Sequence, residues 1–164
     1  MLNKLKEIKI ALMKQRHDIK ERLNNPSVTP KQTDTKLKHE LTLQINGINT
    51  VLTEMKNFAV KNKLANESKL IIDDQVKVLN LVLKQLDKEA EAYTSDHPKA
   101  KDAIFTKGYL QTFIPAEFLP ATTDEMDAFV KEAKEQGLAF KDIMQQAKNH
   151  KNFDMKYISQ AARN

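Results

Sequence analysis

Apolar residues in the first part of the chain recur at alternating three- and four-residue steps, the spacing of one face of an α-helix. The first such stripe predicts a helix over about residues 2–23, which Asn24-Asn25-Pro26 ends because proline cannot continue the backbone ladder. Its members are Leu5, Ile8, Leu12, Ile19 and Leu23. The residues from 24 to 31, with two prolines, are expected to form a loop.

Two longer stripes follow and predict helices over about residues 32–63 and 69–93. The first contains Leu37, Leu41, Ile45, Ile48, Leu52, Met55 and Ala59, flanked by Leu43, Val51 and Phe58. The second contains Ile72, Val76, Leu79, Leu83, Leu86, Ala90 and Tyr93, flanked by Ile71, Val78 and Val82. Two amphipathic helices joined by a short turn are expected to pack antiparallel, with the first helix against them. Gly47 inside the second predicts a close helix crossing or a local bend.

Pro98 suits the first position of a fourth helix, expected over about residues 99–113. Its apolar side is predicted to consist of Ile104, Phe105, Tyr109 and Phe113. Pro115 and Pro120 then exclude a continuous helix, so the segment 114–122 is interpreted as a linker.

Three short helices are predicted after this linker, over about residues 123–136, 140–149 and 154–162. Thr122 and Glu125 have the spacing of a capping box, and Gly137 is a natural residue for a helix end. The inward positions are expected to be Met126, Phe129, Val130, Ala133, Ile143, Met144, Ala147, Met155, Ile158 and Ala162. The sequence therefore predicts an all-α protein with an antiparallel helical bundle at 1–113 and a three-helix subdomain at 123–164.

Composition narrows the range of chemistry. The chain has no Cys, which excludes disulfides, thiol nucleophiles and zinc–thiolate sites. The first twenty residues contain no unbroken apolar run, so neither a signal peptide nor a membrane span is expected there and the cytosol is the predicted location. The net charge of +5 comes mostly from Lys and permits attraction to phosphate.

Catalytic motifs are not found. The four His residues have no metal-ligand spacing, and no HExxH, P-loop or nucleophile elbow occurs. Asp73-Asp74 is interpreted as an acidic first turn that interacts with the helix dipole. We therefore expect no catalytic residue, metal or cofactor in this chain.

Cations near the C-terminus are the one functional candidate. Spacing places two of them, Lys141 and Lys148, on one side of a helix, with His150 and Tyr157 among the cations. The candidate nucleic-acid-binding residues are Lys141, Lys148, Lys151, Lys156 and Arg163. Such a cluster can contact the backbone of a folded RNA through its phosphates, and the alternative is an ordinary solvated helix surface.

The second half of the chain resembles the GatB/YqeY family. Residues 111–118 with Thr123-Asp124-Glu125-Met126 resemble its "EYLP-x-QLSEEEL" junction, and 140–144 resembles its "KDMG-xVM" segment. Asp154-Met155-Lys156 with Ile158 is similar to its "AD-x-K-x-V" helix, and 52–60 to its early "LK-x-x-x-K-N" helix. The chain departs from the family by lacking the glycine after "KDM", by having no glycines at 149–152, and by inserting 119–121.

The resemblance implies a helical module that binds tRNA or a complex of tRNA with an amidotransferase. Members form the tail of the B subunit of a glutamine-dependent amidotransferase, a carbon–nitrogen ligase, or occur as free-standing two-subdomain proteins. The catalytic part of that subunit would be missing here. Two alternatives stay open: a protein-interaction adaptor of viral or mobile-element origin, and an accessory part of such an amidotransferase that is active only with partner subunits.

Overall fold

The computed structural model describes residues 1–25, 32–150 and 152–163, so Lys151 and the predicted loop prolines Pro26 and Pro30 lie outside the described residues. Within these ranges the chain forms seven α-helices and no β-strand, which confirms the all-α class. The helices are α1 (Leu2–Asn24), α2 (Gln32–Lys61), α3 (Ile72–Glu91), α4 (Pro98–Gln111), α5 (Thr123–Glu135), α6 (Phe140–Ala147) and α7 (Met155–Arg163). Short 3₁₀ turns lie at η1 (Glu67–Lys69) and η2 (Ala116–Phe118). Internal contacts divide the chain into two compact units, Met1–Phe113 and Ile114–Asn164.

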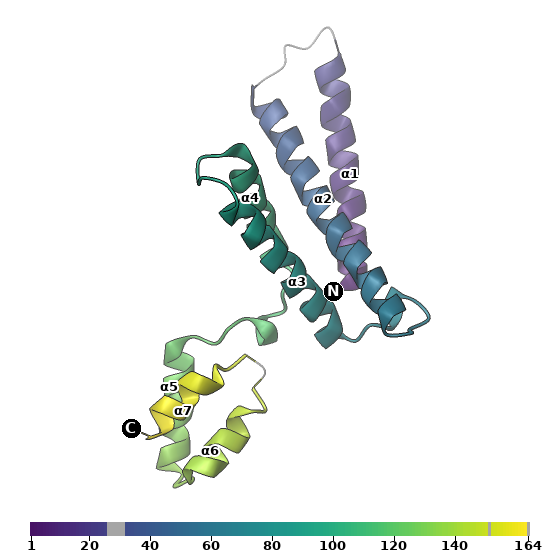
Figure 1. Ribbon diagram of the computed structural model, residues 1–164. Coiled ribbons are helices and arrows are strands. Elements are labelled where there is room, and N and C mark those ends of the chain that lie inside the picture. The colour runs from purple at the N-terminus through teal and green to yellow at the C-terminus, as the bar shows by residue number, and fades with distance from the viewer. Residues whose placement is uncertain (26–31, 151, 164) are drawn as a thin grey trace. The chain divides into compact units, whose positions relative to one another are not determined.

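In the first unit, α1 and α2 form an antiparallel hairpin (Figure 1). Their facing stripes bury Leu5, Ile48, Val51 and Met55 completely, because each helix turns the same apolar face to its partner. This apolar seam holds α1 to α2, and α2 also contacts α3 and α4.

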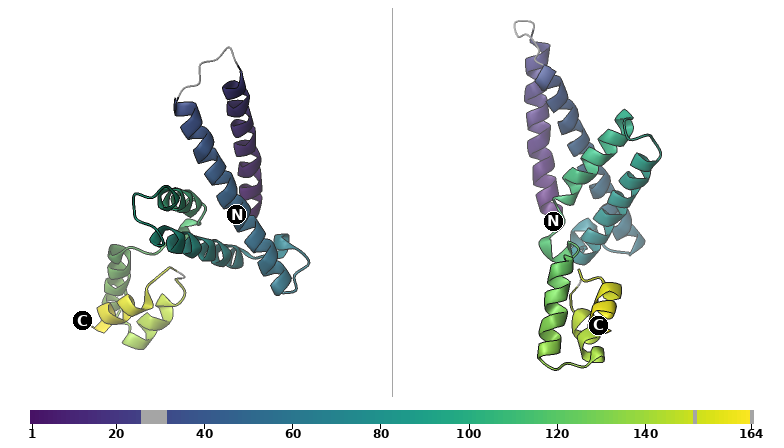
Figure 2. Two further views of the ribbon diagram at one scale, coloured as in Figure 1. Left: turned by 45° about the horizontal axis from the view of Figure 1, so that its top comes forward. Right: turned by 90° about the vertical axis from the view of Figure 1, so that its left-hand side faces the viewer.

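A second hairpin, α3 and α4, packs beside α2 (Figure 2). On α3, Val78, Leu79 and Val82 are almost fully buried, and the acidic first turn carries Asp73 and Asp74 as expected. The helix begins at Ile72 and not at 69, because 67–69 forms the 3₁₀ turn. Ile71, predicted to be a buried flank, is instead the residue before the helix and is 63% exposed.

The helices α2 and α4 cross closely at Gly47, which confirms the close crossing that was one of the two predictions there. A Cβ built on Gly47 would lie 2.7 Å from Thr106 Cγ2. The predicted apolar side of α4 is partly wrong for the same reason: Ile104 is 56% exposed, and small residues face α2 and α3 instead. The buried positions of α4 are Ala100, Ala103, Thr106 and Leu110.

Buried Gln75 joins the start of α1 to the start of α3. Its Oε1 accepts from the backbone N–H of Leu2 at 2.9 Å, and its Nε2 donates to the Leu70 carbonyl at 2.7 Å. The first backbone N–H groups of a helix have no partner within the helix. Gln75 supplies one for α1, so both of its own polar ends are satisfied in the core.

Helix ends follow local chemistry in both units. The Thr122–Glu125 capping box forms, with both reciprocal hydrogen bonds present. Gly137 ends α5 with φ +73°, and its N–H and that of Leu138 donate to carbonyls of the last turn. Lys63 takes the same left-handed position after α2, with φ 56°, although it has a side chain.

The second unit buries the predicted faces of α5, α6 and α7 on one another. Val130, Ile143, Ala147 and Ile158 form its centre, and every inward position predicted for these helices belongs to or packs against this core. Ala121 N–H donates to the Asn152 carbonyl at 3.0 Å, which ties the segment before α5 to the connection between α6 and α7.

Candidate nucleic-acid interface

The structure places the four described candidate cations on the α6–α7 hairpin. Lys141 lies in the first turn of α6, Lys148 directly follows that helix, Lys156 lies in the first turn of α7, and Arg163 ends it. All four are exposed, and the fifth candidate, Lys151, lies outside the described residues. None of the three described lysines forms an ion pair with another described side chain.

Arg163 lies near one end of the hairpin. Its guanidinium stacks over the Phe140 ring, 5.2 Å from the centroid, which places it beside the first turn of α6 and near Lys141. Lys148 directly follows the last residue of α6 and Lys156 lies in the first turn of α7, so these two lysines flank the connection between the helices. The candidates therefore form two pairs along one hairpin and not a single cluster.

Charge within the second unit is segregated between helices. The α5 helix carries five carboxylates against Lys131 and Lys134, whereas the sequence from 136 onward carries five cations against Asp142 and Asp154. The whole unit, residues 114–164, has seven cations and eight carboxylates, so the excess positive charge of the chain resides in residues 1–113. The cations of the second unit that lie apart from the α5 carboxylates are therefore those of residues 136–164.

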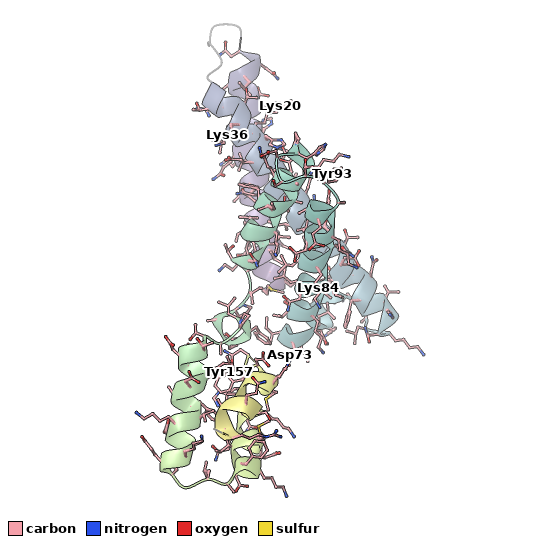
Figure 3. The ribbon with its side chains drawn as sticks, turned by 60° about the vertical axis from the view of Figure 1, so that its left-hand side comes forward. Lys20, Lys36, Asp73, Lys84, Tyr93 and Tyr157 are labelled. Atoms are coloured by element: carbon pink, nitrogen blue, oxygen red, sulfur yellow. The ribbon has the colours of Figure 1, made fainter. Side chains whose placement is uncertain are left out.

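Two polar contacts fix α7 against α5. The hydroxyl of Tyr157, a residue labelled in Figure 3, donates to Asp127 Oδ1 at 2.8 Å. This hydrogen bond, with some burial and the charges of Asp127 and Asp124, raises the pKa of Tyr157. At the other end, Lys134 Nζ donates to the Ala161 carbonyl at 3.1 Å, a favourable charge at a helix C-terminus.

Sequence reasoning missed an aromatic cluster beside Lys148. The exposed His150 ring stacks on Phe153 at 4.3 Å and 8°, and Phe129 meets both rings edge-on at 5.2 and 5.1 Å. Phe129 lies on α5, far from the other two rings in sequence, so helical spacing alone could not group them. The sequence feature that could have revealed part of this cluster is the three-residue spacing of His150 and Phe153 in the α6–α7 connection.

Among the residues that the structure describes, no three His, Asp or Glu side chains gather closely enough to hold a metal ion. In the same part of the chain, no helix combines the length and the apolar character that crossing a bilayer requires.

Comparison with known proteins leaves the resemblance as a prediction: no family model, no curated protein and no solved structure matches this chain.

Proposed function

We propose that the chain is a non-catalytic, YqeY-like module that binds tRNA, alone or in complex with an amidotransferase-type enzyme, through its α6–α7 hairpin. The motif resemblance supplies the ligand class. The observation that carries the proposal is the segregation of exposed, unpaired Lys141, Lys148 and Lys156 onto one hairpin, away from the carboxylates of α5.

The chemistry of the hairpin suits a folded RNA. Lysine side chains neutralise phosphates without reading sequence, so they position a backbone. The exposed His150 ring, held by Phe153, lies two residues from Lys148 and offers a face on which an unpaired base can stack. A loop or single-stranded end of a tRNA presents both chemistries together.

Salt-dependent binding of unfractionated tRNA to the full chain tests this proposal. We expect the triple variant Lys141→Ala, Lys148→Ala, Lys156→Ala to lose about tenfold in affinity at low salt and to reduce the salt slope by roughly two to three. Phe153→Ala is expected to weaken binding of tRNA more than binding of duplex RNA, because it removes the support of the His150 ring.

A triple variant elsewhere controls for net charge alone. Lys84→Ala, Lys88→Ala, Lys131→Ala removes the same charge from exposed positions on α3 and α5; Lys84 is labelled in Figure 3. It is expected to leave the affinity within about twofold. Equal losses in the two triple variants, or binding that is insensitive to salt, would contradict the proposal.

A further inference from the structure

We propose that the first unit carries a second, independent binding surface: the groove between α1 and α2 takes an acidic amphipathic helix of a partner protein. The α1–α2 groove is about 460 Å³ and is lined by Lys6, Lys9, Ile10 and Met13 of α1 and by Leu52 and Lys56 of α2. It lies wholly within residues 1–113 and shares no residue with the α6–α7 hairpin.

The floor of the groove is apolar and open to solvent. Ile10 is 69% exposed and Met13 is 43% exposed, one helical turn apart, and Leu52 faces them from α2. Thr53 of α2 also lines the groove, and Val60, which is 76% exposed, lies two helical turns further along the same helix. Ile10, Met13 and Val60 are largely exposed, so they add little to the buried core and leave apolar surface open to a partner.

The charged side chains that line the groove are mostly positive, and we call its three lysines the lysine frame. Lys6, Lys9 and Lys56 line the groove, and Glu67 is the one carboxylate among its described lining residues. Lys6 Nζ already pairs with Glu67 Oε1 at 3.0 Å. A hydrogen bond from its own backbone, followed by the hydrogen bond from Lys6 and the charges of Lys6 and Lys56, lowers the pKa of Glu67. An occupant with carboxylates beside an apolar stripe complements this surface.

The dimensions suit a helix. The lining residues span positions 6–13 of α1 and 49–56 of α2, and Val60 extends the second row. At 1.5 Å per residue, these rows are about 10 to 16 Å long, or two to three helical turns. A partner helix with apolar residues at i, i+3 or i+4, and i+7 would place one side chain against each of Ile10, Met13 and Leu52.

Other occupants fit less well. The described lining contains neither arginine nor an aromatic ring, the side chains on which RNA bases stack. A membrane-binding helix typically presents Trp, Phe and Leu along the apolar face of one helix, whereas this groove is lined by two helices and its lining contains no Trp or Phe. The apolar floor with its lysine frame therefore favours a peptide helix.

The test is a selection of displayed helical peptides of about 15 residues on the full chain, with counter-selection on Ile10→Glu, Met13→Glu. We expect the enriched peptides to share an apolar i, i+3/i+4, i+7 stripe flanked by Asp or Glu. The tightest synthetic peptide should bind the double variant at least about tenfold more weakly. Ile104→Glu, at an exposed position on α4, should leave its affinity within about twofold.

Reversing the charge of two groove lysines tests their contribution to binding separately from that of the apolar residues. The double variant Lys9→Glu, Lys56→Glu should bind the acidic peptide about tenfold more weakly than the wild-type chain does. It should bind more tightly a second peptide in which the acidic residues of the first are changed to Lys. The triple lysine variant of α6–α7 should bind the peptide normally, so this inference and the proposed RNA function can fail separately. Circular dichroism confirms that each variant stays helical.

Three results would overturn the inference. One is enrichment of peptides that lack acidic flanks or bind the Ile10→Glu, Met13→Glu variant equally well. Another is binding of wild-type chain to phosphatidylserine vesicles that the same double variant abolishes, since the groove would then serve a membrane surface. The third is loss of tRNA binding in that variant, which would assign the groove to RNA.

Discussion

Gly47 of α2 and Thr106 of α4 lie in direct contact, with space for a hydrogen but not for a methyl group at position 47. Thr106 cannot turn aside easily, because its Oγ1 donates to the Asp102 carbonyl at 2.8 Å and its side chain is buried. The crossing of α2 and α4 is therefore set by a missing side chain.

Gly47→Ala is expected to destabilise the first unit by about 1 to 3 kcal/mol, although alanine normally stabilises a helix interior by about 1 kcal/mol. Adding Thr106→Ser removes the opposing methyl and keeps the hydroxyl, so the double variant should recover most of the loss. Urea unfolding of the two single variants and the double variant measures this coupling. Additive effects would show that the two side chains do not compete for the same space.

Gln75→Leu should cost about 2 kcal/mol or more in the free energy of unfolding. The leucine cannot accept from the Leu2 N–H or donate to the Leu70 carbonyl, and both groups would lose their partner near the core. Gln85→Leu, on the exposed side of the same helix, is the matched control and should change stability by less than about 0.5 kcal/mol. Equal stability of the two variants would contradict the role given to Gln75.

Lys63→Gly should stabilise the protein by about 0.5 to 1 kcal/mol, since glycine adopts the left-handed conformation at φ 56° without a Cβ penalty. Lys63 N–H donates to the Val60 carbonyl at 3.0 Å and Leu64 N–H to the Ala59 carbonyl at 2.9 Å, and neither bond needs the lysine side chain. Gly137→Ala tests the reverse and should destabilise the second unit by about 1 kcal/mol. Thermal unfolding reports both, and a loss of stability in Lys63→Gly would count against this account.

Tyr157 should ionise above the ordinary tyrosine pKa of about 10, because its hydroxyl donates to Asp127 and a phenolate would face that carboxylate. The folded pKa is raised, so this contribution to stability is present below the unfolded pKa and is lost as pH rises through the folded one. Asp127→Asn should lower the pKa toward its usual value, as followed by phenolate absorbance. The pKa of Tyr109, raised by burial, should not respond to Asp127→Asn.

Helix positions were predictable because spacing decides them. The stripes of α1 and α5–α7 lie where the sequence places them, and so does that of α2 except for Leu37, which is 42% exposed. Thr122 begins α5 and Gly137 ends it, as their chemistry requires. The face of α4 was not predictable from size alone. Ile104 is exposed because the close crossing of α2 and α4 at Gly47 favours the small Ala103 on the inside. That crossing depends on a residue of α2 almost sixty positions earlier in the sequence, which the spacing within α4 does not reveal.

The candidate site was predictable in part. The sequence identifies Lys141, Lys148, Lys156 and Arg163 as cations of short helices, and the structure shows them exposed. It could not show that Arg163 lies over Phe140, since that contact depends on the antiparallel packing of two helices. Whether these cations bind RNA stays a prediction.

The hydrogen bond from Leu2 to Gln75 spans 73 positions and joins α1 of one hairpin to α3 of the other. An amide at the start of a helix normally exchanges its proton with solvent quickly, because it has no partner in the helix. Here the Leu2 amide donates to Gln75 instead, so its exchange rate reports on how often the contact between the starts of α1 and α3 opens. A single slow amide at position 2 would show that the two hairpins rarely separate at this contact.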